Sequence, residues 1–136
     1  MHCIYWRLRL CKVRMKTKKP ELVKTSPGFL YIKTILAQNT TAKIIHAVNG
    51  QDAIEKFLNN PDIDIILMDL KMPEINGLEA TVKIKSLNKD IPVIAITAYA
   101  MMGDEKRILE AGCDSYISKP ISKKALLDKI AEFITI

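Results

Sequence analysis

The chain has 136 residues, 49% of them hydrophobic, which is typical of one globular domain with a full core. No apolar run approaches the roughly 20 residues of a membrane span, and no secretory leader pattern is present, so we expect a cytoplasmic protein without a membrane span. The net charge of +6 comes from residues 1–28, which hold eight basic residues and one acid. Residues 29–136 hold thirteen basic and fourteen acidic residues, which argues against nucleic-acid binding by this part.

Residues 1–28 form an atypical basic N-terminal segment, which we expect to be irregular. Trp6–Leu10 alternates like a strand, whereas Ile4, Leu8 and Cys11 fall at helical spacing, so neither template is favoured. The chain has three cysteines without the spacing of a disulfide or zinc motif, so we expect reduced thiols with no special role. Because periodicity changes at Ser26-Pro27-Gly28, we place a boundary at residue 28.

From residue 29 onward, helical and extended patterns alternate. We expect helices over 29–36, 53–58, 78–87 and 104–111 and a last helix after the N-cap Ser122, with strands over 42–47, 63–69, 92–97 and 116–118. In the helix near 78–87, we expect Leu78, Val82 and Leu87 to form the buried face. This alternation predicts an α/β fold with a parallel sheet between helix layers, and its opening strand should lie just before Phe29.

Polar side chains end three successive strands. The buried run 63–69 ends in Asp69 and is followed by a turn at Pro73 and Asn76-Gly77, the next strand ends in Thr97, and the last ends in Lys119. The carboxyl ends of parallel strands share one edge, so we expect these three side chains to converge. A carboxylate can attack phosphorus, while an ammonium and a hydroxyl stabilise the phosphoryl oxygens. The trio therefore indicates a phosphoryl-accepting site.

These motifs resemble the CheY-like receiver domain of two-component response regulators. The resemblance covers Phe29–Ile136 and is carried by Ile66-Leu67-Met68-Asp69-Leu70-Lys71-Met72-Pro73 with Gly77, by Ile96-Thr97-Ala98, by Tyr116-Ile117-Ser118-Lys119-Pro120, and by Asn49-Gly50 with Ala53. It implies a flavodoxin-like, doubly wound parallel sheet of five strands with helices on both faces. It also implies a phosphorelay module rather than an enzyme, either a stand-alone regulator or the receiver of a hybrid sensor histidine kinase.

The resemblance also implies roles for single residues. Asp69 would accept a phosphoryl group from a histidine kinase or a histidine phosphotransfer protein. Lys119, preceding a cis peptide bond to Pro120, and Thr97 would contact that group. Thr97 and Tyr116 would act as the switch that repacks the face built from the fourth helix, fifth strand and fifth helix. Mg²⁺ would bind Asp69 and the main-chain carbonyl of Lys71.

The N-terminal segment departs from the family pattern. Family members begin with an apolar strand that ends in two adjacent acids, which bind Mg²⁺. The equivalent positions fall near Val23 and Lys24, and Glu21 is the one carboxylate among the first 51 residues, so it is a poor substitute ligand. Three explanations stay open: a diverged pseudo-receiver, a foreign sequence ahead of an intact remainder, or Trp6–Leu10 filling the place of the first strand.

Two other function classes remain for comparison. A pseudo-receiver would use the same fold as an interaction module without phosphorylation, because the acidic pair is missing. A hydrolase of the haloacid dehalogenase type would need a second Asp two positions after Asp69, where Lys71 stands. A glycine-rich phosphate loop, which nucleotide binding would need, follows none of the expected strands. The oligomeric state is not predicted.

Overall fold

The computed structural model describes residues 3–7, 27–40, 42–70, 77–98 and 104–134. Strands and helices alternate along it, with bounds β1 Cys3–Arg7, α1 Pro27–Asn39, β2 Lys43–Ala47, α2 Gly50–Asn59, β3 Ile65–Asp69, α3 Gly77–Leu87, β4 Val93–Thr97, α4 Asp104–Glu110, β5 Ser115–Ser118 and α5 Lys123–Ala131. From α1 onward, every helix and strand expected from the sequence is present. Among the described residues, none of the helices combines the length and apolar character needed to cross a membrane.

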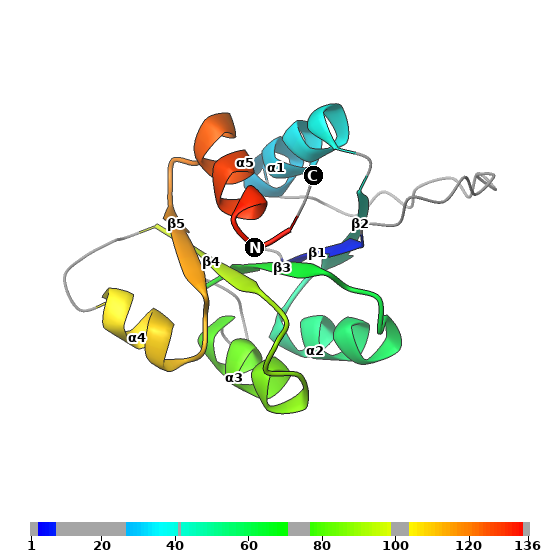
Figure 1. Ribbon diagram of the computed structural model, residues 1–136, viewed down its shortest axis with the longest axis vertical. Coiled ribbons are helices and arrows are strands. Elements are labelled where there is room, and N and C mark those ends of the chain that lie inside the picture. Colours follow the sequence, from blue (N-terminus) through cyan, green and yellow to red (C-terminus); the bar gives the residue numbers. More distant parts are fainter. Residues whose placement is uncertain (1–2, 8–26, 41, 71–76, 99–103, 135–136) are drawn as a thin grey trace.

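The five strands form one sheet in the order β2-β1-β3-β4-β5. Helices α1 and α5 cover one face, and α2, α3 and α4 cover the other (Figure 1). Strands β3, β4 and β5 pair in parallel. Strands β2 and β3 also run in the same direction, because each pairs with β1 in antiparallel fashion. The structure thus has the α/β receiver architecture, a parallel sheet with alternating helices, apart from one strand.

Strand β1 corrects the predicted wholly parallel sheet. It occupies the central position, but it runs against its neighbours, with Cys3 opposite Met68 of β3 and Arg7 opposite Lys43 of β2. A short connection to the next helix would force a right-handed parallel crossover. Here α1 begins only at Pro27, far along the chain from Arg7, so no such constraint sets the direction of β1. The strand also lies at residues 3–7 rather than 6–10, and the stretch before residue 27 where we expected it lies outside the described residues.

The parallel strands are buried on both faces because their side chains alternate between two cores. In β3, Ile66 and Met68 pack in the cluster with α2, α3 and α4, whereas Ile65 and Leu67 pack in the cluster with α1 and α5. All five residues of β3 and of β4 are buried. Burial on both faces explains the unbroken apolar run that precedes Asp69. Asp69 is the last residue of this buried strand.

The buried face of α3 differs from the face that its apolar spacing predicted. Val82 and Leu87, expected in the buried face, are 54% and 50% exposed. Ala80, Thr81 and Ile84 face the core instead. Thr81 tolerates full burial because its hydroxyl donates a hydrogen bond of 2.8 Å to the carbonyl oxygen of Gly77.

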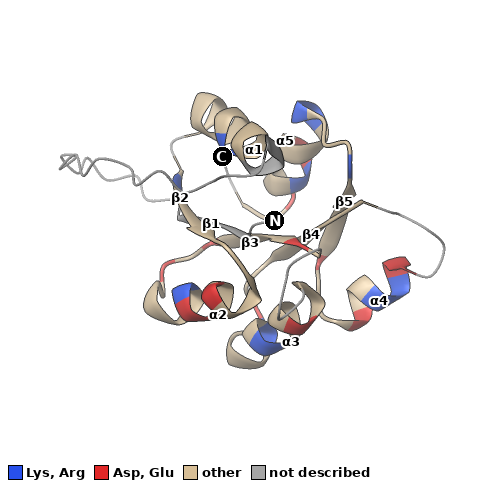
Figure 2. Ribbon diagram, turned by 180° about the vertical axis from the view of Figure 1, so that it is seen from behind, with Lys and Arg blue, Asp and Glu red and all other residues tan. Residues whose placement is uncertain are grey.

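The remaining surface and core features are those of an ordinary domain. Helices α2, α3 and α4 carry both basic and acidic side chains, as Figure 2 shows. Cys113 is a buried free cysteine. Burial raises the pKa of its thiol, which keeps the sulfur protonated and unreactive at neutral pH.

Candidate functional site

Asp69 is the last residue of β3 and emerges at the carboxyl edge of the sheet. The residue is only 9% exposed. The Lys119 ammonium lies 3.0 Å from Oδ2 of this carboxylate and is the more exposed partner of the pair, at 38% against 12% for the side chains. A charge-assisted hydrogen bond in a partly desolvated site is short and directional. The positive charge of Lys119 is therefore held next to one oxygen atom of the Asp69 carboxylate.

The backbone joins the ends of β3, β4 and β5 at this edge. The amide of Leu70 donates to the carbonyl oxygen of Ile96 at 3.1 Å, and the amide of Lys119 donates to the carbonyl oxygen of Thr97 at 2.7 Å. The Lys119-Pro120 peptide bond is cis, as the resemblance implies. Thr97 closes β4 and is 7% exposed. The structure thus brings Asp69, Thr97 and Lys119 to one edge, each at the end of its own strand.

Gly77, which the sequence places in the turn after Asp69 and in the receiver motif, lies against the end of β3. A Cβ atom at this position would lie 2.4 Å from the carbonyl oxygen of Asp69 and 2.9 Å from Cα of Leu70. Both are backbone atoms, which cannot move aside as a flexible side chain can. Helix α3 can begin this close to Asp69 only because residue 77 is glycine. The signal in the sequence was Asn76-Gly77, which is equally typical of an ordinary turn.

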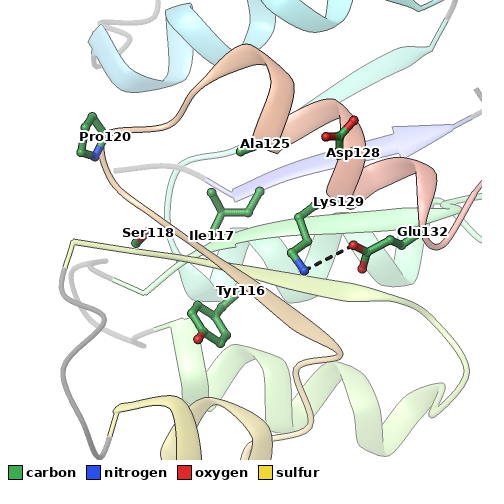
Figure 3. Close-up of a pocket in the computed structure, with 8 residues that line it drawn as sticks. All are labelled: Tyr116, Ile117, Ser118, Pro120, Ala125, Asp128, Lys129 and Glu132. Carbon is green, nitrogen blue, oxygen red and sulfur yellow. Dashed lines mark hydrogen bonds and ion pairs between the residues drawn. The ribbon is translucent and has the colours of Figure 1, made fainter.

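Tyr116 lies on β5, away from the Asp69–Lys119 pair. It is partly buried against the cluster that includes Ile108 of α4. Figure 3 shows its ring projecting from β5 toward the side of α4. Tyr116 is also one of the residues that line a hollow of about 350 Å³ between β5 and α5. Lys129 of α5 crosses this hollow and pairs with Glu132 at 3.4 Å. Tyr116 thus borders the surface formed by α4, β5 and α5.

The predicted metal ligands are only partly described. Asp69 lies at the edge as stated, whereas Lys71 and Glu21 fall outside the described residues. Within the described ranges, His, Cys, Asp and Glu side chains form no group of three that could hold a metal ion.

Comparison with known families gives one match that covers most of the chain. The response regulator receiver domain family matches residues 29–131. The polar-differentiation response regulator DivK of Brucella anthropi is 44% identical over 92 residues, which is 66% of this chain and 74% of that protein. The DivK protein of Brucella ovis is 49% identical over 73 residues, or 52% of this chain, and the match spans only 59% of that relative's length.

Solved structures agree in fold. The CheX–CheY–BeF3–Mg²⁺ complex from Borrelia burgdorferi contains a chain with 26% identity and a TM-score of 0.68, with 79% of this chain and 81% of that chain covered. The receiver domain of a Pseudomonas aeruginosa sensor histidine kinase, solved with magnesium coordinated in its active-site cleft, has 27% identity and a TM-score of 0.66, with 78% and 87% covered. The chain therefore belongs to the response regulator receiver domain family, whose members are modules of two-component signalling rather than catalytic enzymes.

Proposed function

We propose that this receiver accepts a phosphoryl group on Asp69 from the phosphohistidine of a histidine kinase or a histidine phosphotransfer protein. An Asp69 carboxylate oxygen forms the new bond to phosphorus, and the bond from phosphorus to the histidine nitrogen breaks. The leaving imidazole takes up a proton from solvent or from the donor protein. The observation that carries this proposal is the Lys119 ammonium 3.0 Å from the carboxylate, with Thr97 ending the neighbouring strand.

Lys119 and Thr97 have complementary roles in this proposal. The transferred group brings negative charge to a site where Asp69 is already anionic, so a fixed ammonium offsets the charge that develops. Thr97 can donate its hydroxyl proton to a phosphoryl oxygen and would move toward it. Tyr116 then senses that displacement because β4 and β5 pair in register at Ala95 and Tyr116, two residues before Thr97. The hollow between β5 and α5 lies next to Tyr116 and is the surface on which the change would be read.

The direct test is intact mass after incubation with acetyl phosphate. We expect wild type to gain one phosphoryl group, and Asp69→Asn to gain none. Asp64→Asn is the matched control, since Asp64 directly precedes β3 and lies at the opposite end of the same strand from Asp69. Lys119→Met should slow the gain at least about tenfold, because an interaction that offsets transition-state charge contributes on the order of 1.4 kcal/mol or more. Equal labelling of wild type and Asp69→Asn would contradict the proposal.

The second candidate is a pseudo-receiver, an interaction module that uses the same fold without phosphorylation. It is favoured by one feature of the sequence, because Val23 and Lys24 stand near the positions where family members carry two adjacent acids. Wild type that folds by circular dichroism and takes no phosphoryl group from acetyl phosphate or from a phosphorylated partner would support this candidate.

A further inference from the structure

Helix α4 buries little of its own surface. It lies at the border of its helix layer, beside β5 (Figure 1), and Ile108 is the one buried side chain among its seven residues. Within the described residues, its side chains form two ion pairs, Lys106–Glu110 and Asp104–Arg107, and both join residues of the same helix. A helix of this length is not stable in isolation, because its first turn is costly to form. The position of α4 therefore depends on the few contacts that it makes with neighbouring elements.

Residues 111–114 form the corner between α4 and β5, and the backbone of this corner is closely held. The amide of Gly112, whose φ is +100°, donates to the carbonyl oxygen of Leu109 at 3.0 Å. The amide of Cys113 donates to the carbonyl oxygen of Ile108 at 3.2 Å. Two such bonds around a left-handed glycine are a common way for a helix to end. The carboxyl end of α4 is thereby joined firmly to the corner.

Lys85, in the last turn of α3, ties the corner to the neighbouring helix. Its ammonium lies 2.7 Å from Oδ2 of Asp114, and the Lys85 side chain is 14% exposed, against 36% for Asp114. The same carboxylate oxygen accepts a hydrogen bond of 2.8 Å from the amide of Val93, the first residue of β4. The stem of Lys85 passes over Gly112, since a Cβ atom there would lie 3.2 Å from Cγ of Lys85. One carboxylate therefore joins α3, β4 and the corner.

The corner also borders a second hollow, of about 430 Å³, between α4 and α5, which we call the α4 hollow. Residues of α4, the corner, β5 and α5 line it, namely Glu105, Leu109, Asp114, Ser115, Tyr116 and Lys129. Asp114 thus lines the α4 hollow and also pairs with Lys85, which is not one of the lining residues. A substitution of Lys85 therefore reaches the hollow through the position of the corner rather than by direct contact.

We propose that the Lys85–Asp114 ion pair anchors the carboxyl end of α4 and thereby sets the shape of the α4 hollow. With the pair formed, the corner is tied to α3, and α4 keeps its place beside β5. With the pair broken, α4 opens locally more often, since segments with few buried contacts open at a low cost in free energy. The proposal goes beyond phosphoryl transfer, because it requires no phosphodonor and involves neither Asp69 nor Lys119.

Backbone hydrogen exchange measured by nuclear magnetic resonance tests the anchor. The reporters are the amides of Ala111, Gly112 and Cys113, which donate to carbonyl oxygens of α4. In Lys85→Met, an unbranched stem still covers Gly112 while the ammonium is removed. We expect about fivefold faster exchange of the three amides, which corresponds to the loss of about 1 kcal/mol for a partly exposed ion pair.

Three comparisons make this test specific. Lys106→Met removes an ammonium from the exposed pair inside α4 and should leave the exchange rates unchanged. Lys85→Arg should restore slow exchange, because it returns the cation. The amide of Thr40, which donates to the carbonyl oxygen of Leu36 at the end of α1, should exchange equally in all variants. Equal rates at the corner in wild type and Lys85→Met, or acceleration that also reaches Thr40, would overturn the proposal.

Asp114→Asn breaks the same pair from the other side. Its side-chain oxygen can still accept a hydrogen bond from the Val93 amide, so the link to β4 is kept. We expect the same faster exchange as in Lys85→Met and no further increase when the two substitutions are combined, because both remove one interaction. Additive increases in the double variant would overturn the pairing. This variant also decides the exchange test if Lys85→Met does not fold by circular dichroism.

The shape of the α4 hollow is tested separately, through Tyr116. With 3-fluorotyrosine in place of the four tyrosines, the fluorine resonance of Tyr116 is assigned by its loss in Tyr116→Phe. We expect Lys85→Met to shift this resonance and Lys106→Met to leave it unchanged. The same Tyr116 resonance in wild type and Lys85→Met would show that the ion pair does not set the shape of the hollow, which would overturn the proposal.

Discussion

Asp69 and Lys119 are fifty positions apart in sequence and meet because Asp69 ends β3 and Lys119 directly follows β5 of the same sheet. Their chemistry depends on how the main chain holds them, and two backbone hydrogen bonds at this edge, from Leu70 and from Lys119, fix the spacing of the three strand ends. Gly77 adds a third constraint from the helix side. The geometry of the Asp69–Lys119 site is therefore a property of the backbone as much as of the two charged side chains.

Substitution of Gly77 tests this backbone constraint. Gly77→Ala places a methyl group 2.4 Å from the carbonyl oxygen of Asp69, so α3 or the end of β3 must shift. We expect a loss of about 1–3 kcal/mol in the free energy of unfolding, measured by urea denaturation, together with slower labelling of Asp69. Gly112→Ala is the control, because Gly112 has φ of +100° and its strain lies far from Asp69. Normal labelling in Gly77→Ala would show that α3 does not position the acceptor.

At the scale of single elements, most boundaries could be predicted from the sequence, and the faces less well. Caps are local, so the N-cap Ser122 could be predicted from a few adjacent residues, whereas the N-cap role of Asn49 was not predicted. The predicted buried face of α3 was wrong because Ala80, Thr81 and Ile84 are buried in this helix, whereas the larger Val82 and Leu87 lie at the surface. Close packing against a sheet selects small side chains, and apolar spacing alone does not reveal it.

Helix α2 carries a pH-dependent contribution to stability through Asp52. Burial by itself raises the pKa of this carboxyl, but hydrogen bonds from Lys56 and from the Val48 amide outweigh it and hold the pKa below its ordinary value. A lowered pKa stabilises the fold above about pH 4, and this stabilisation is lost as the pH falls through the folded-state pKa. The pair is close to solvent, so its contribution is at most about 1 kcal/mol.

Urea denaturation of wild type and Asp52→Asn between pH 7 and pH 3 measures this contribution. We expect wild type to be the more stable protein at pH 7 and the difference to shrink below about pH 4. Lys56→Met, which removes the same ion pair from the other side, should flatten the profile in the same way. A stability difference between wild type and Asp52→Asn that stays constant across this range would exclude the proposed linkage.

At the scale of the whole molecule, the meeting of three strand ends at one edge was easier to predict from the sequence than the direction of the first strand. The ends of β3, β4 and β5 are joined by short βα units, whose handedness is set, so their convergence could be inferred from order alone. The direction of β1 could not be inferred, because the pairing of a segment that lies far from its neighbours in sequence obeys no local rule. The division of the chain at residue 28 stays a prediction, although residues 3–7 lie within the sheet.

The antiparallel direction of β1 is the feature that sets this sheet apart from a wholly parallel one, and nuclear Overhauser contacts between backbone Hα atoms measure it most directly. Neighbouring antiparallel strands bring Cα atoms of non-hydrogen-bonded pairs to about 4.5 Å, which gives strong Hα–Hα contacts that parallel strands lack. We predict such contacts from residues 3–7 to both Lys43–Ala47 and Ile65–Asp69, in the register in which Ile4 opposes His46 and Leu67. A spectrum without Hα–Hα contacts from residues 3–7 to either neighbour would contradict the account.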